Sequence, residues 1–134
     1  MREQVRDLGR LEHILEAIRN AMEFGKDTTP ESLAKDQMRY FAIVKNIEII
    51  GEAAYMLSME FKRDHPDTEW DTIIRMRHVL VHGYYQVSYD EIVSVIAKDL
   101  WPLYEQIVNY IGELTQQKKK TPSDAIGGSP SIIM

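Results

Sequence analysis

The chain contains no cysteine among its 134 residues, which excludes disulfide bonds and thiolate metal ligands. It also lacks any apolar run of about 18 residues, the length that a membrane-spanning helix needs. Arg2, Glu3, Arg6 and Asp7 interrupt the N-terminus, so no signal peptide is indicated. We therefore expect a cytoplasmic protein that does not act at a membrane.

Positive charge is also scarce, because 16 lysines and arginines stand against 21 acidic residues and give a formal net charge of −5. Broad electrostatic affinity for nucleic acid needs many basic contacts to phosphate, so the net charge argues against this class of binder. Any contact with RNA must be local. Glycine-rich phosphate loops and alternating apolar segments are missing too, and 134 residues suffice for one domain.

What the chain does have is apolar residues at helical spacing. A first helix is predicted over about residues 2–24, ending near Gly25, with His13 facing solvent. Thr29 and Pro30 are suited to begin the next helix, as its cap and first residue. The apolar stripe of the first helix consists of Leu8, Leu11, Leu15, Ile18 and Met22.

A second, long helix is predicted over about residues 31–62, since no proline interrupts its apolar period. Gly51 lies inside it, and a glycine that costs about 1 kcal/mol against alanine there indicates a close helix crossing. Glu52 has two interpretations. It is either a catalytic acid or a surface carboxylate, in the second case paired with a basic residue from a neighbouring helix.

Two further helices complete the prediction. Thr68 and Asp71 resemble a capping box for a third helix that ends at Gly83, and Ser88 and Glu91 form a capping box for a fourth. Pro102 should kink or divide the fourth helix, which continues to about residue 116. The third helix is expected to bury Trp70, Ile73, Ile74, Leu80 and Val81.

These elements predict an all-α protein, an antiparallel bundle of four or five helices. The bundle should occupy residues 1–116. Residues 117–134 are polar and rich in lysine, glycine, serine and proline, so we expect a flexible tail.

Residues 75–85 carry the densest set of groups able to bind phosphate or move a proton. Arg77 offers a permanent charge on a planar fork, and His82 can exchange a proton near neutral pH. Five residues separate them, a rotation of about 140° on a regular helix, so they should not share a face. They could meet if the helix loosens before Gly83, or if a two-fold dimer brings both chains together.

Two other interpretations of this segment remain. His78 and His82 have the spacing of a zinc-binding pair, but Val79 stands where metalloproteases have glutamate and no third ligand is nearby, so no metal is expected. In a purely structural interpretation, Arg77 pairs with Asp71 or Glu69 and the tyrosines fill gaps between helices.

The stretch from Arg77 to Tyr84 resembles the Arg-x4-His-x-Tyr motif of the HepT toxins, which belong to the HEPN group of small helical ribonucleases. Trp70 with Ile73 and Ile74, residues 50–54 and residues 99–103 resemble other segments of that family, in the right order. The family pattern usually has asparagine where His78 stands, and we expect His78 to support the site.

The resemblance implies a HEPN-like fold and a metal-independent endoribonuclease toxin of a toxin–antitoxin system, of type II or VII, without a cofactor. Arg77 would contact the scissile phosphate of the RNA substrate and His82 would transfer protons, in the cleft of a homodimer. The implied partner is a minimal nucleotidyltransferase antitoxin, which would form a hetero-oligomer with the toxin and silence it by transferring AMP to Tyr84. Tyr85 is an adjacent alternative acceptor.

A second hypothesis belongs to another class. The chain could be a non-catalytic helical binding partner or regulator of the nucleotidyltransferase, with the motif used as a contact surface. Toxicity on expression alone discriminates between the two.

Overall fold

The structure is a computed structural model that describes residues 2–119, apart from the side chains of Gln4, Tyr84, Lys118 and Lys119. This part of the chain is all-α and contains no strand, as the sequence predicted. In chain order its elements are α1 (Arg2–Phe24), α2 (Pro30–Ala34), α3 (Gln37–Met56), α4 (Met59–Asp64), α5 (Trp70–Gly83), a 3₁₀ turn η1 (Tyr84–Gln86), α6 (Tyr89–Ser94), a π-helical segment η2 (Val95–Asp99) and α7 (Leu100–Lys119).

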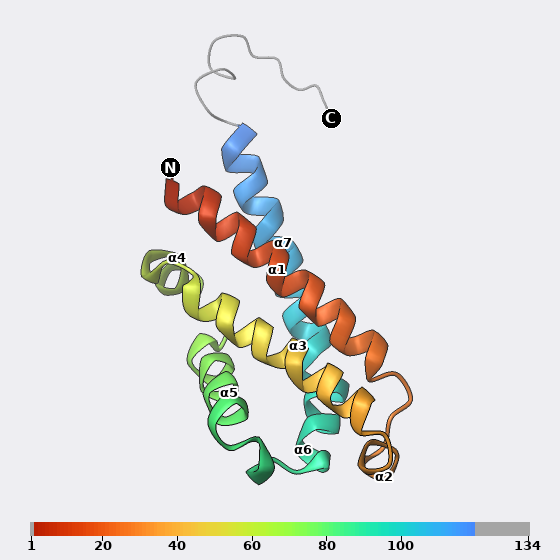
Figure 1. Cartoon of the computed structure of the whole chain (residues 1–134). Helices are drawn as coiled ribbons and strands as arrows, with labels where there is room; N and C mark the ends of the chain where they lie inside the picture. The colour runs from red at the N-terminus through yellow and green to blue at the C-terminus, as the bar shows by residue number, and fades with distance from the viewer. Residues whose placement is uncertain (1, 120–134) are drawn as a thin grey trace.

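Helix α3 is the centre of the bundle. It packs against α1 on one side and α5 on the other, while α7 packs against α1 (Figure 1). The predicted stripe of α1 does face the core, because Leu11 and Ile18 are fully buried and His13 is exposed. No helix within residues 2–119 combines the length and hydropathy needed to cross a bilayer.

The buried residues form two hydrophobic clusters. Both include residues of α5, the helix that carries Arg77, His78 and His82. Trp70, at the start of α5, is buried in a cluster shared with α1, α3, α4 and α7. Leu80, near the end of α5, is only 1% exposed and lies in a second cluster with residues of α2, α3 and α6. Helix α5 is therefore fixed at both ends.

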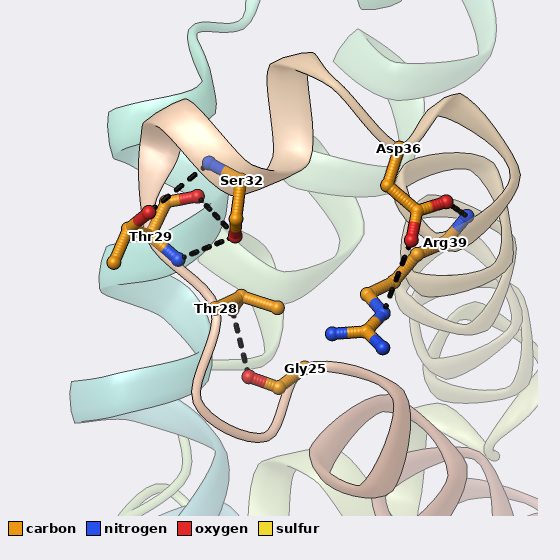
Figure 2. A network of polar contacts seen from close by, with 6 residues as sticks. All are labelled: Gly25, Thr28, Thr29, Ser32, Asp36 and Arg39. Atoms are coloured by element: carbon orange, nitrogen blue, oxygen red, sulfur yellow. Dashed lines mark hydrogen bonds and ion pairs between the residues drawn. The ribbon is translucent and has the colours of Figure 1, made fainter.

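The prediction of one helix over residues 31–62 is wrong, because two helix caps, Asp36 and Ser58, divide it into α2, α3 and α4. Thr29 caps α2 through its hydroxyl, which accepts a hydrogen bond from the Ser32 amide at 3.0 Å. Asp36 ends the connection and caps α3, accepting from the Arg39 amide at 3.1 Å (Figure 2). Asparagine, aspartate, serine and threonine cap well because their oxygens satisfy amides that lack helical partners.

The second break, between α3 and α4, depends on a contact from α1. Asp7 is buried, and its carboxylate accepts hydrogen bonds from the Ser58 amide at 2.8 Å and the Ser58 hydroxyl at 2.7 Å. The Ser58 hydroxyl in turn caps α4 by accepting from the Phe61 amide. A carboxylate that accepts two hydrogen bonds is stable inside the protein.

The predicted capping box at Thr68 is also wrong. Helix α5 begins at Trp70, and the buried Thr68 hydroxyl instead bonds to the Gln106 side chain and the Tyr110 hydroxyl, each at 2.7 Å. This contact joins the segment before α5 to α7. The Ser88 capping box of α6 is confirmed, with the Glu91 carboxylate accepting from the Ser88 amide at 2.9 Å.

The disturbance expected from Pro102 appears just before it, as the π-helical segment η2. The amide of Leu100 donates to the carbonyl of Val95, five residues back, so the helix is widened there. Helix α7 then continues to Lys119 rather than ending near Gln116. Residues 120–134, most of the predicted tail, lie outside the described residues.

Candidate functional site

The site begins with the crossing of α5 over α3 at Gly51. A Cβ built on this glycine would overlap the Cβ of Arg77 and would lie 3.1 Å from the carbonyl oxygen of Ile73. Only a residue without a side chain lets the two helices approach so closely. The prediction of a close helix crossing at Gly51 is thus confirmed, and the crossing point lies directly beneath Arg77.

Arg77 forms an ion pair across this crossing. Its Nη2 lies 2.7 Å from Oε1 of Glu52, with the arginine side chain 31% exposed and the glutamate 52% exposed. The interpretation of Glu52 as a carboxylate paired with a neighbouring helix is therefore confirmed. The proposed pairing of Arg77 with Asp71 or Glu69 is wrong, because the partner comes from α3.

The guanidinium keeps donors that this ion pair does not occupy. Arginine carries five N–H groups in a fixed fork, and Glu52 takes only part of them. An ion pair this exposed contributes about 0–1 kcal/mol, so a phosphate can compete for Arg77 at little cost. Glu52 orients the guanidinium and leaves some of its N–H groups able to bind a phosphate.

The two histidines of the motif lie together at the C-terminal end of α5. His78 and His82 are both exposed, and their ring centroids are 4.6 Å apart with the ring planes inclined at 53°. They stand one helical turn apart, as their spacing predicts. The structure thus brings His78 and His82 into contact.

Arg77 and His82 do not meet within one chain. Helix α5 stays regular through Gly83, so the helix does not loosen before that glycine, and the single-chain route considered from the sequence is wrong. The two side chains leave α5 in directions about 140° apart. Within residues 2–119 no hydrogen bond or ion pair joins them.

The motif tyrosines follow α5 in the turn η1. The side chain of Tyr84 lies outside what the structure describes. Tyr85 is 74% exposed.

The surface around the histidines is partly apolar. Val79 and Val81 are 36% and 43% exposed, so the expectation that Val81 is buried is wrong. Two hollows of about 590 and 440 Å³ lie at the other end of α5, and both are lined by Thr68, Glu69 and Thr72. Neither of these two hollows is lined by Arg77 or by the histidines.

The described residues offer no group of three or more His, Cys, Asp or Glu side chains that could hold a metal ion. The pairing of Arg77 with Glu52 is the main feature that the sequence did not predict. A mid-helix glycine directly before an acidic residue was the available signal, since it marks both the crossing and the charge beside it.

The comparisons with known proteins identify the family of the chain. The family model "Ribonuclease HepT-like" matches residues 14–111. A protein of Caldanaerobacter subterraneus named "Putative RNase" is 36% identical over 109 residues, which cover 81% of this chain and 94% of that protein. A "Probable ribonuclease HepT" of Thermococcus cleftensis is 36% identical over 90 residues, which cover 67% of this chain and 82% of that protein.

A longer relative from Methanocaldococcus jannaschii, named "Gamma-glutamylcyclotransferase and putative RNase", is 34% identical over 108 residues. The match covers 81% of this chain but only 49% of that protein, so the chain spans about half of its length. The search of solved structures gave no significant match. The family model and the relatives together show that the chain belongs to the ribonuclease HepT-like family.

Proposed function

We propose that the protein is a metal-independent endoribonuclease toxin of a toxin–antitoxin system, with Arg77 and His82 as its catalytic residues. The observation that carries the proposal is that α5 presents a guanidinium and an imidazole at the surface of a chain from the ribonuclease HepT-like family. Two relatives of this chain are named as ribonucleases, which supports RNA as the substrate.

The chemistry requires a base and an anion-binding group. His82 removes the proton of a ribose 2′-hydroxyl, and the 2′-oxygen attacks the adjacent phosphorus. The P–O5′ bond breaks, and the leaving oxygen takes up a proton from a protonated imidazole or from water. Arg77 stabilises the negative charge that grows on the phosphate oxygens. The products are a 2′,3′-cyclic phosphate and a free 5′-hydroxyl.

A homodimer supplies the geometry that one chain lacks. Arg77 and His82 point away from each other on a regular helix, and the surface beside them exposes Val79 and Val81. A two-fold axis near the end of α5 would cover these valines and set the arginine of one chain near the histidine of its partner. It would also concentrate positive charge locally on an acidic protein.

Glu52 has a supporting role in this proposal. It neutralises Arg77 and holds it over Gly51 while no RNA is bound. A phosphate of the RNA then replaces Glu52 at part of the guanidinium fork. His78, beside His82 on α5, limits the positions that the catalytic imidazole can adopt.

Control by the antitoxin belongs to the same proposal. A minimal nucleotidyltransferase would form a hetero-oligomer with the toxin and transfer AMP to Tyr84, with Tyr85 as the neighbouring acceptor. The added phosphate would satisfy Arg77 with an internal anion and exclude the RNA backbone. Mass spectrometry of protein co-expressed with the antitoxin would identify which tyrosine is modified.

The test uses His82→Ala and, as a matched control, His13→Ala, which removes an exposed histidine of α1. Both variants and the wild type are incubated with total RNA, with and without chelator, and the RNA ends are mapped. We expect His82→Ala to lose cleavage and growth arrest at unchanged helix content, while His13→Ala behaves as the wild type. Full cleavage by His82→Ala would refute the mechanism.

The alternative is a non-catalytic binding partner of the nucleotidyltransferase. The ion pair of Arg77 with Glu52 favours it, because it gives the arginine a purely structural task. A wild-type protein that cleaves no RNA and causes no growth arrest, but changes the activity of the nucleotidyltransferase, would establish this alternative.

A further inference from the structure

The imidazoles of His78 and His82 form a pair that the cleavage reaction does not use fully, since only His82 exchanges protons in it. Both side chains are exposed on one face of α5, and their ring centroids are 4.6 Å apart. The ring planes are inclined at 53°, so the rings do not lie flat on each other. The pair is therefore accessible to a ligand from solvent that two imidazoles can share.

A metal ion held by two histidines determines the distance between their rings. With a metal–nitrogen bond of about 2.0–2.1 Å and a ring nitrogen about 1.2 Å from its centroid, each centroid lies about 3.2 Å from the ion. At nitrogen–metal–nitrogen angles of about 90–110°, the two centroids are then about 4.5–5.2 Å apart. The observed 4.6 Å falls within this interval, so the rings are close enough to share an ion once a nitrogen of each ring turns towards it.

We propose that His78 and His82 of one chain together bind a divalent transition-metal ion such as Zn²⁺. Imidazole nitrogen is a preferred ligand of zinc, nickel and copper, and two imidazoles on one helix turn act as a chelate. The part of the chain that the structure describes contributes no third ligand, so water completes the coordination. Such an open site exchanges its ion readily and is regulatory rather than structural.

The bound ion inhibits RNA cleavage. A neutral imidazole has one N–H group and one nitrogen lone pair, and the metal takes the lone pair of His82. His82 then has no site left to accept the proton of a ribose 2′-hydroxyl. The inhibition, unlike the binding, rests on the proposed function.

Calorimetric titration with Zn²⁺ tests the binding. The full chain is prepared without a polyhistidine tag, and the wild type is compared with His78→Asn and His82→Asn. His13→Asn is the matched control, because His13 is exposed on α1, away from the pair. We expect either variant of the pair to weaken Zn²⁺ binding at least about 10²-fold through loss of the chelate, and His13→Asn to bind as the wild type.

Nitrogen-15 spectra of the imidazole rings give a second measurement of binding that needs no catalysis. Zn²⁺ should shift the ring signals of His78 and His82 and leave those of His13 unchanged. Unweakened binding by His78→Asn, or shifts confined to other histidines, would overturn the metal site.

The inhibition is measured as cleavage with Zn²⁺ divided by the cleavage of the same protein in chelator. We expect Zn²⁺ to inhibit the wild type and His13→Asn but not His78→Asn. Zn²⁺ that binds at the pair without slowing the wild type would overturn the inhibitory role. Cleavage absent from every sample in chelator would overturn the proposed nuclease, and the calorimetry would then decide the metal site alone.

Discussion

Gly51 is the residue on which the position of Arg77 depends. Its missing Cβ lets α5 rest on α3, and the Arg77–Glu52 ion pair closes over the contact. The sequence predicted Arg77, His78 and His82 as site residues through their local motif. It could not assign Glu52 to Arg77, because a contact between helices depends on how they cross and not on spacing along the chain.

Replacing Gly51 by alanine should separate α5 from α3. The new methyl group would overlap Arg77, so we expect the free energy of unfolding to fall by about 1–3 kcal/mol. Urea denaturation followed by circular dichroism measures this change.

Gly112→Ala is the matched control for this substitution. Gly112 is an exposed helical glycine of α7 with nothing within 4 Å of a built Cβ. Alanine is the better helix former, so this variant should gain up to about 1 kcal/mol. Equal effects of the two substitutions would show that crowding at the crossing is not the cause.

At the scale of the helices, the sequence predicted correctly those helix boundaries that depend on residues close together in the chain. The boundaries of α1 and the capping box of α6 follow from residues within four positions of each other. The division between α3 and α4 depends instead on Asp7, which is 51 residues from Ser58 in the sequence. The prediction for Thr68 failed for a similar reason, because its hydroxyl forms a hydrogen bond with the Tyr110 hydroxyl of α7.

The burial of Tyr110 should make stability depend on pH in alkaline solution. Burial is the main cause that raises the pKa of Tyr110, opposed by the Thr68 hydrogen bond and reinforced by Asp67 and Glu113. The folded state thus holds the phenolic proton more tightly than the unfolded state. Its contribution is complete below about pH 10, the pKa of an unfolded tyrosine, and is lost as the pH rises through the folded pKa.

We expect the wild type to lose more stability than Tyr110→Phe between pH 9 and pH 11. Burial lowers the pKa of Lys62, whose contribution has the opposite sign in the same range, so the difference between the two proteins is the informative quantity. Urea denaturation at each pH measures it. Tyr55→Phe, at a 60% exposed tyrosine, controls for the loss of a hydroxyl. A wild type and Tyr110→Phe with the same pH dependence would contradict the argument.

At the scale of the whole molecule, the fold was predictable because apolar periodicity alone requires a helical bundle. Periodicity does not predict the assembly, because an exposed apolar face has the same spacing as a buried one, and the homodimer was expected only from the family resemblance and from the angle between Arg77 and His82. Val81 illustrates this, since it was expected in the core and is 43% exposed. Its exposure is what a homodimer at the end of α5 would explain.

Val81→Asp should prevent dimer formation and abolish RNA cleavage, because a buried unpaired carboxylate is unfavourable at an interface. Val108→Asp, at a valine of α7 that is 41% exposed, is the matched control and should do neither. Sedimentation equilibrium measures the mass, and unfolding shows that each chain stays folded. A wild type that is monomeric at all concentrations yet cleaves RNA would rule out the shared site.

The angle at which Arg77 and His82 leave α5 has a consequence for dosage. If two chains must join before either can act, the cutting rate in a dilute cell rises with the square of the copy number. A few stray molecules would then be harmless, while a burst of synthesis would cross a threshold abruptly. The angle between two side chains on one helix would thereby determine how much unintended synthesis of the protein a host tolerates.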